Sequence, residues 1–238
     1  MKFINLELKR TSMKGYLMGA AGVFAFGLVM AFAFPFLAHL EEYGADSKDM
    51  WIFTTWKGLM VPVSGMVMAG FSILASAMAA RIMITEYMGK NAILLFSYPV
   101  SRKKILGAKC RLIWGFTAGV TLVSQIIIFL IMGVSSNLLH FVPERFRLED
   151  MGSVLAAGIV LSVLTPAIGQ IAMRIGFWKK SPIAAVVACV ILICPMTNLF
   201  MLGAQSGIFI MLGITVIALA GAVGCYMGLV KKVNEMEV

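Results

Sequence analysis

The chain has 238 residues, of which 61% are hydrophobic and only 13% are charged. An ordinary soluble domain has about a quarter of its residues charged, and its core could not bury this much apolar surface. The composition therefore excludes a soluble globular protein and predicts a chain whose solvent is a lipid bilayer. The net charge of +9 would favour nucleic-acid binding in a soluble protein. Here the basic residues gather at the ends of apolar stretches, where they set membrane topology.

Six apolar stretches are each about 20 residues or longer, the length with which an α-helix crosses roughly 30 Å of hydrocarbon. They cover approximately residues 15–38, 57–80, 107–134, 151–173, 182–202 and 206–230. Continuous apolar runs favour helices over barrel strands, in which lumen-facing and lipid-facing residues alternate. We therefore predict an all-α integral membrane protein, a single domain with six transmembrane helices. The last two spans are so close in sequence that we expect a hairpin.

Prolines and glycines occur within the predicted spans. Three prolines, Pro62, Pro166 and Pro195, each remove a backbone hydrogen bond and permit a kink. Neighbouring helices can satisfy the backbone groups that are left. Two pairs of glycines have the spacing that allows close helix packing, namely Gly115 with Gly119 and Gly224 with Gly228. The cysteines, three of them within apolar stretches, indicate neither a disulfide framework nor a metal site.

Lysine and arginine residues are distributed unequally between the two sides of these spans. If both termini are cytoplasmic, the basic residues outside are only Lys48, Lys57, Arg145 and Arg147. Those inside are Lys2, Lys9, Arg10, Lys14, Arg81, Lys90, Arg102, Lys103, Lys104, Lys109, Arg111, Arg174, Lys179, Lys180, Lys231 and Lys232. The opposite orientation would reverse this bias, so we predict that both termini are cytoplasmic.

The longest predicted cytoplasmic connection, residues 82–106, is the most informative segment. It contains four consecutive apolar residues, 93–96, which would be costly to leave in water. Pro99 stops a helix after them, and Ser101 offers an N-cap to the next helix. We therefore expect a short amphipathic helix, a break and a new helix.

This segment resembles the cytoplasmic loop of the ABC-2 type permeases, the membrane subunits of ATP-binding cassette exporters. In that family an acidic residue and a glycine precede a Leu-Leu pair, then Pro-Val-Ser-Arg or Pro-Ile-Ser-Arg, then a basic approach to the third span. The matching positions here are Glu86, Gly89, Leu94, Leu95, Pro99, Val100, Ser101, Arg102 and Lys109. Residues 1–14 are similar to the interfacial helix with which these permeases begin. The resemblance therefore covers the full length.

The resemblance implies a coupling helix in this loop that binds in a groove of a separate cytosolic ATPase. The residues that would couple to the ATPase are Glu86, Gly89, Leu94, Leu95, Pro99, Ser101 and Arg102. The sequence has no Gly-x-x-x-x-Gly-Lys-Ser/Thr phosphate loop. We therefore expect no enzymatic activity and no cofactor in this chain, with ATP and Mg²⁺ bound by the partner subunit.

The resemblance also bears on assembly and cargo. Six spans are half of the usual complement of such exporters, which implies a homodimer or a pair with a similar permease. The chain resembles the small permeases that serve bacteriocin and antimicrobial-peptide export or immunity. The resemblance implies a location in a bacterial plasma membrane. We expect an exported amphipathic or apolar substrate, because the spans carry almost no charged residues.

Polar residues within the spans leave alternatives open. Gln125, Gln170 and Asn198 are candidates for lining a pathway, although such residues more often form helix–helix hydrogen bonds. An ATP-independent secondary transporter would usually carry clustered polar groups near the bilayer midplane. A lipid-interacting membrane protein could instead rest its basic loop on anionic headgroups. An intramembrane enzyme is disfavoured, since His39 and His140 lie on different loops without metal-binding spacing.

Overall fold

The computed structural model describes residues 12–41, 56–87, 102–139, 148–206 and 208–234. These residues form six long α-helices: α2 (Lys14–Glu41), α4 (Trp56–Ala79), α6 (Arg102–Leu139), α7 (Leu148–Trp178), α8 (Pro182–Ser206) and α9 (Ile208–Asn234). A π-helix, η2 (Ala80–Ile84), continues α4. Each long helix contains a segment long and apolar enough to cross a membrane. The prediction of an all-α membrane protein with six spans is confirmed.

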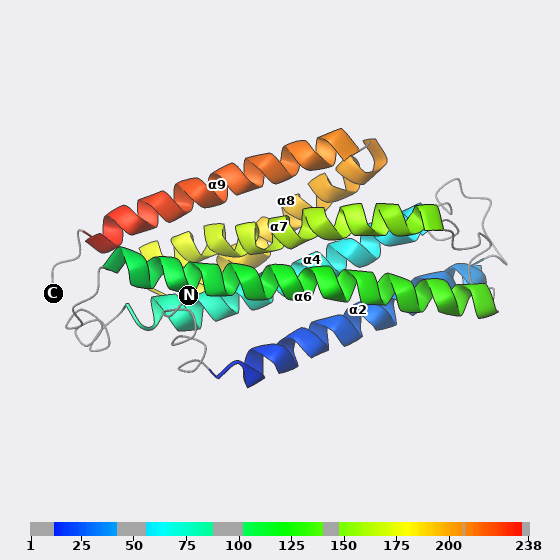
Figure 1. Cartoon of the computed structure of the whole chain (residues 1–238), viewed down its shortest axis with the longest axis horizontal. Helices are drawn as coiled ribbons and strands as arrows, with labels where there is room; N and C mark the ends of the chain where they lie inside the picture. Colours follow the sequence, from blue (N-terminus) through cyan, green and yellow to red (C-terminus); the bar gives the residue numbers. More distant parts are fainter. Residues whose placement is uncertain (1–11, 42–55, 88–101, 140–147, 207, 235–238) are drawn as a thin grey trace.

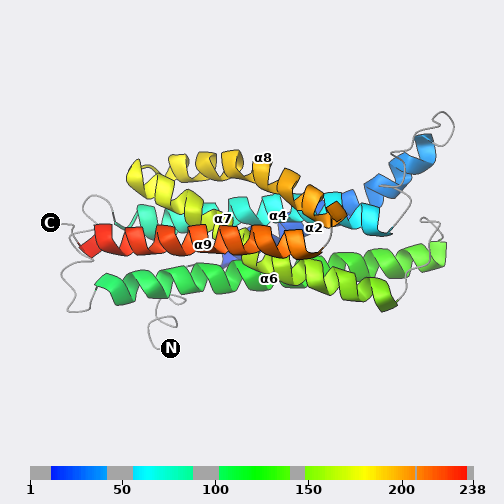
Figure 2. The same cartoon turned by 90° about the horizontal axis from the view of Figure 1, so that it is seen from above.

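The helices form an up-and-down bundle in which successive helices run antiparallel (Figure 1). Helix α4 packs against α2, α6, α7 and α8, and α7 packs against α4, α6, α8 and α9. These two helices form the centre, while α2 and α9 lie at opposite edges (Figure 1). Figure 2 shows the bundle from above, with α6 and α8 on opposite sides of α7.

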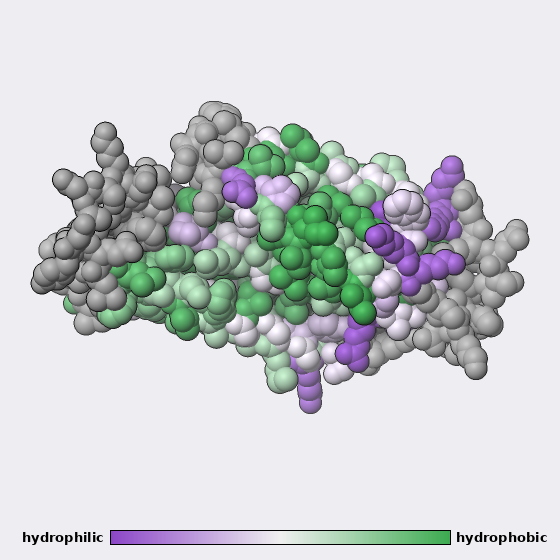
Figure 3. Space-filling model, turned by 180° about the vertical axis from the view of Figure 1, so that it is seen from behind, coloured by the Kyte–Doolittle hydropathy of each residue, from purple (hydrophilic) through white to green (hydrophobic). Residues whose placement is uncertain are grey.

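One end of the bundle is basic. At this end α4, α7 and α9 finish and α2, α6 and α8 begin. Exposed Lys103, Lys104, Lys179 and Lys231 lie here, and we call it the basic end. Seen from behind, apolar residues cover much of the length of the bundle and hydrophilic residues gather towards one end (Figure 3). A hydrocarbon layer accommodates the apolar band, and the lysines reach water beside it.

The turn between α7 and α8 shows how the backbone carbonyls at the end of a helix find hydrogen-bond donors at the basic end. Lys180 has φ 49°, which is the left-handed region. The Ser181 amide donates to the Gly176 carbonyl (3.1 Å) and the Lys180 amide to the Phe177 carbonyl (3.4 Å). These are the two bonds of a Schellman motif. Ser181 then caps α8, because its Oγ accepts the Ala184 amide at 3.4 Å.

Several sequence predictions concern particular positions in the fold. Pro62, Pro166 and Pro195 lie inside α4, α7 and α8 respectively. Helix α8 ends at Ser206 and α9 begins at Ile208, which is the expected hairpin (Figure 1). The interfacial helix predicted for residues 1–14 lies almost entirely outside the described residues. So do residues 88–101, which hold the predicted coupling helix.

Among the predicted glycine pairs, Gly228 lies close to a neighbouring helix, because a Cβ there would lie 3.3 Å from a guanidinium nitrogen of Arg174 of α7. A Cβ placed on Gly115, Gly119 or Gly224 would meet no described atom within 4 Å. On Gly176 of α7 it would lie 2.8 Å from Ile84 Cδ1 and 2.9 Å from Ala185 Cα. Since Ala185 belongs to α8, the missing side chain at Gly176 lets α7, α8 and η2 meet at the basic end.

We predict opposite effects for two glycine-to-alanine substitutions. Gly176→Ala should destabilise the protein by about 1–3 kcal/mol, because backbone and a buried side chain must move. Gly115→Ala, also within a helix but facing open space, should be neutral or stabilising by up to about 1 kcal/mol through helix propensity. Thermal unfolding of the detergent-purified chain measures both. A similar shift for the two variants would contradict the packing at Gly176.

Candidate functional site

Helix α4 changes its winding at the start of the predicted coupling loop, residues 82–106. The Thr85 amide donates to the Ala80 carbonyl (3.1 Å), a bond of the π-helical type, and Thr85 Oγ1 donates to the same carbonyl (3.2 Å). Single π-turns are rare and frequently occur at functional sites. Glu86 and Tyr87 follow in a turn and are the last described residues before the loop.

A buried lysine of α6 holds this turn. Lys109 has 0% exposure, and its Nζ donates to the Ile82 carbonyl at 3.0 Å. The same ammonium forms an ion pair with Glu86 Oε2 and lies 5.8 Å from the ring centroid of Tyr87. A buried charge is costly unless it is paired and hydrogen-bonded. We call residues 80–87 together with Lys109 the junction.

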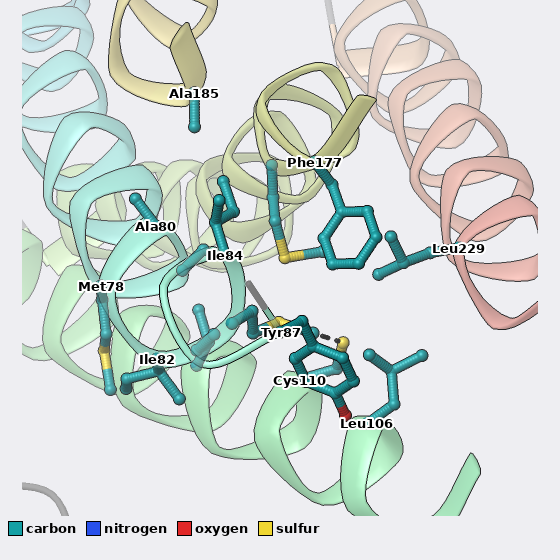
Figure 4. Packing of buried hydrophobic residues seen from close by; sticks show 14 of the residues in the cluster. Met78, Ala80, Ile82, Ile84, Tyr87, Leu106, Cys110, Phe177, Ala185 and Leu229 are labelled. Carbon is teal, nitrogen blue, oxygen red and sulfur yellow. Dashed lines mark hydrogen bonds between the residues drawn. The ribbon is translucent and has the colours of Figure 1, made fainter. Parts of the chain in front are cut away.

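An apolar cluster surrounds the junction (Figure 4). The Tyr87 ring meets Phe177 of α7 edge to face, with centroids 6.0 Å apart and an interplanar angle of 61°. Cys110 Sγ of α6 lies 3.9 Å from Met83 Sδ. The same cluster includes Ala185 of α8 and Leu229 of α9. The turn that precedes the loop therefore shares one apolar cluster with α6, α7, α8 and α9.

A groove opens between α6 and α9 at the basic end, with Gln170 of α7 at its floor. Its volume is about 1050 Å³. The lining residues are Lys103, Lys104, Gly107, Cys110, Arg111, Trp114, Gln170, Ala222, Val223, Tyr226, Met227, Val230 and Lys231. Trp114 Nε1 donates to Gln170 Oε1 (3.3 Å), and Gln170 Nε2 contacts Cys110 Sγ (3.8 Å). We call this space the α6–α9 groove.

The structure places only some of the predicted coupling residues. Glu86 lies in the junction, with 21% of its side chain exposed. Arg102 is the first residue of α6, directly after the position expected for an N-cap. Residues Gly89, Leu94, Leu95, Pro99 and Ser101 lie outside the described part of the chain.

The three candidate pathway residues are not brought together. Gln125 has 0% exposure, and its Nε2 donates to Ser64 Oγ of α4. Gln170 lies at the floor of the α6–α9 groove. Asn198 is exposed, and its Nδ2 donates to the Cys194 carbonyl of its own helix at 2.7 Å.

The pairing of Lys109 was not foreseen, although its sequence position was informative. Buried Leu106, Cys110 and Ile113 of α6 recur at the spacing of one helix face. Lys109 falls on that face, three residues after Leu106, so a charge inside the apolar stripe called for a buried partner. In the part of the chain that is described, no group of His, Cys, Asp and Glu side chains could hold a metal ion.

Comparison with known proteins agrees with this architecture. The sequence matches the family model described as "ABC-2 family transporter protein" over residues 19–196. It is also similar to the "Uncharacterized protein YcbO" of Bacillus subtilis (strain 168), with 24% identity over 193 residues, covering 81% of this chain and 82% of that protein. No solved structure matches the chain. The matched family range runs from α2 into α8 and includes the junction.

Breaking the ion pair from its two sides should have unequal effects. Glu86→Ala leaves a fully buried ammonium without its carboxylate, which should cost on the order of 3 kcal/mol of stability. Lys109→Met keeps the volume and leaves a partly exposed carboxylate that can reach water, so its cost should be about 1 kcal/mol or less. The double variant should resemble Lys109→Met. Thermal unfolding in detergent gives all three values, and additive losses would contradict the pairing.

Proposed function

Because the chain belongs to the ABC-2 family of transporter proteins, we propose that it is the permease of an exporter whose ATP is hydrolysed by a separate nucleotide-binding subunit. Membership of the family makes the chain a multi-pass membrane component of a transporter. The observation that carries the coupling proposal is the Glu86–Lys109 ion pair, which joins the two ends of the cytoplasmic loop.

The loop is the proposed contact with the ATPase subunit. Its sequence combines the apolar residues 93–96 with the basic residues that precede α6. An amphipathic helix of this kind binds by burying its apolar face in a groove of the partner. ATP and Mg²⁺ would bind in that partner, and the loop would follow its closure on nucleotide.

The junction explains how such a movement would reach the spans. The chain enters the loop after Tyr87 and leaves it at Arg102, and Lys109 lies about two turns further into α6. Its ammonium holds both Glu86 and the Ile82 carbonyl. A force on the loop therefore displaces the end of α4 and the start of α6 as one unit. Packed helices shift together in this way in other switching proteins.

The proposed cargo is an amphipathic or apolar molecule, with an antimicrobial peptide as one example. Among the described residues, Lys109 is the charged side chain that is fully buried, and the junction occupies it. The basic side chains that line the α6–α9 groove lie at its mouth, at the basic end of the bundle. Two copies of the chain around one pathway, in a bacterial plasma membrane, complete the proposal.

A gradient-driven transporter is the second candidate, and one observation favours it. Ser72 Oγ, Gln125 Oε1 and Thr165 Oγ1 are buried without a hydrogen-bond partner among the described residues. Unsatisfied oxygens inside a helix bundle are the kind of group that coordinates a driving ion. Recovery of an ATPase partner separates the two candidates.

The coupling proposal predicts that a nucleotide-binding subunit is recovered with the chain. The full chain is purified from its native membrane in mild detergent with nucleotide present, and bound proteins are identified by mass spectrometry. Leu95→Asp should abolish recovery of that subunit, because a charge replaces an apolar contact of the loop. Leu138→Asp is the matched control, since Leu138 is 74% exposed and lies at the opposite end of α6.

In the reconstituted complex, Glu86→Gln should retain the ATPase subunit but lose most partner-stimulated ATP hydrolysis, because the ion pair that joins Glu86 to Lys109 of α6 is lost. Recovery of no nucleotide-binding subunit with the unsubstituted chain would overturn the exporter proposal. Full stimulation by Glu86→Gln would overturn only the role of the junction.

The proposed orientation places the basic end in the cytoplasm. In a chain without its native cysteines, Asp46→Cys should react only with a membrane-impermeant thiol reagent added outside the cell. Lys179→Cys is the control at the basic end and should react only after the membrane is permeabilised. Labelling of Asp46→Cys from the cytoplasmic side alone would show the inverse topology.

A further inference from the structure

The α6–α9 groove changes in character along its length. Lys103 and Lys104 of α6 lie near Lys231 of α9 at the end that faces the basic loops. Trp114, Ala222 and Val223 line the other end, about 15 Å deeper along α6. The groove therefore has a cationic mouth and an apolar interior, which is the polarity of an amphiphilic ligand with an anionic head.

The cations at the mouth lie at a helix end where positive charge destabilises the helix. Residues 102–104 form the first turn of α6 and are all basic, with no acidic residue among them. The helix dipole is positive at this end, so each cation there is unfavourable, by about 0.3–1 kcal/mol. An anion bound at the mouth would neutralise these lysines.

Arg111 extends the cationic surface into the groove. Its Nε donates to the Gly107 carbonyl at 3.1 Å, which directs the guanidinium back towards Lys103 and Lys104. The described lining residues include four basic side chains and no carboxylate. Gly107 also lets the opposite wall come close, because a Cβ there would lie 3.2 Å from the Tyr226 hydroxyl.

We propose that the α6–α9 groove binds an anionic phospholipid from the leaflet at the basic end. Its phosphate lies among Lys103, Lys104, Arg111 and Lys231, and an acyl chain runs along the wall formed by Ala222, Val223 and Met227 of α9. Basic pockets between transmembrane helices bind acidic headgroups in this way. The volume of about 1050 Å³ is at the upper end of ordinary ligand sites, which span roughly 300–1,000 Å³.

A second copy of the chain fits this surface poorly. In a two-fold symmetric contact the same patch meets itself, so these cations would face each other. A cytosolic protein would also have to enter between two transmembrane helices, whereas a lipid is already there. The site does not depend on the exporter proposal, and its test uses no ATPase.

The test measures lipid binding to the full chain in detergent by native mass spectrometry. Dioleoyl phosphatidylglycerol should bind more tightly than dioleoyl phosphatidylcholine, which has the same chains and no net charge. Lys104→Gln with Arg111→Gln should weaken phosphatidylglycerol binding roughly fivefold per cation, on the order of 30-fold for both. The matched control, Lys179→Gln with Lys180→Gln, removes two exposed cations of the same end outside the groove and should have little effect.

A second variant tests the acyl-chain path with all charges retained. Val223 is 44% exposed, so Val223→Trp fills the groove without disturbing the core and should also abolish the preference for phosphatidylglycerol. Inorganic phosphate, offered as the headgroup alone, should not compete. Equal loss in the control pair, an unaffected Val223→Trp, competition by phosphate or the absence of any preference would each overturn the proposal.

Discussion

Hydrocarbon offers no hydrogen bonds, and this constraint governs how the backbone and many polar side chains of the bundle are placed. The backbone is satisfied within long helices, as a chain must be when water is absent. Side-chain hydroxyls follow the same rule: Thr117 donates to the Ile113 carbonyl and Thr121 to the Thr117 carbonyl, each at 2.7 Å. Gln125 reaches across to Ser64 of α4. The middle of the bundle is thus held by hydrogen bonds within helices, by the Gln125–Ser64 bond between α6 and α4, and by close packing.

The basic end departs from this pattern, because a full charge is buried there. Lys109 is acceptable in its position only since Glu86, the Ile82 carbonyl and the Tyr87 ring all face its ammonium. Each of these groups belongs to the segment in which α4 widens into η2 and ends. The π-turn and the buried lysine therefore depend on each other, and both lie where the predicted coupling loop begins. A buried ion pair is weak evidence for stability, so a role in holding two helices in register accounts for it better.

The sequence predicts the membrane-spanning helices but not the contacts between them, because those contacts depend on residues far apart in the chain. Hydrophobic length alone predicts the six long helices, because a run of about twenty apolar residues in a bilayer forms a spanning helix. It could not predict which glycines allow close approach, since Gly176 faces η2 and α8 whereas Gly115 faces open space, and the local sequence does not distinguish the two. Glu86 was identified through a family resemblance, but its partner depends on how η2 meets α6. The α6–α9 groove joins residues more than a hundred positions apart, and no local pattern indicates such a pairing.

Helix α6 carries both sites on different faces. Lys109 and Arg111 are two residues apart, which places them about 200° apart around the helix axis. Lys109 is buried within the junction, whereas exposed Arg111 lines the α6–α9 groove. Helix α6 is one continuous helix of 38 residues, so a lipid held on one face and a force applied at the other act on the same element. If the groove binds lipid more tightly in one position of α6 than in another, the bound lipid must by linkage favour that position. The two proposals are thus separate in their chemistry and joined through one mechanical element.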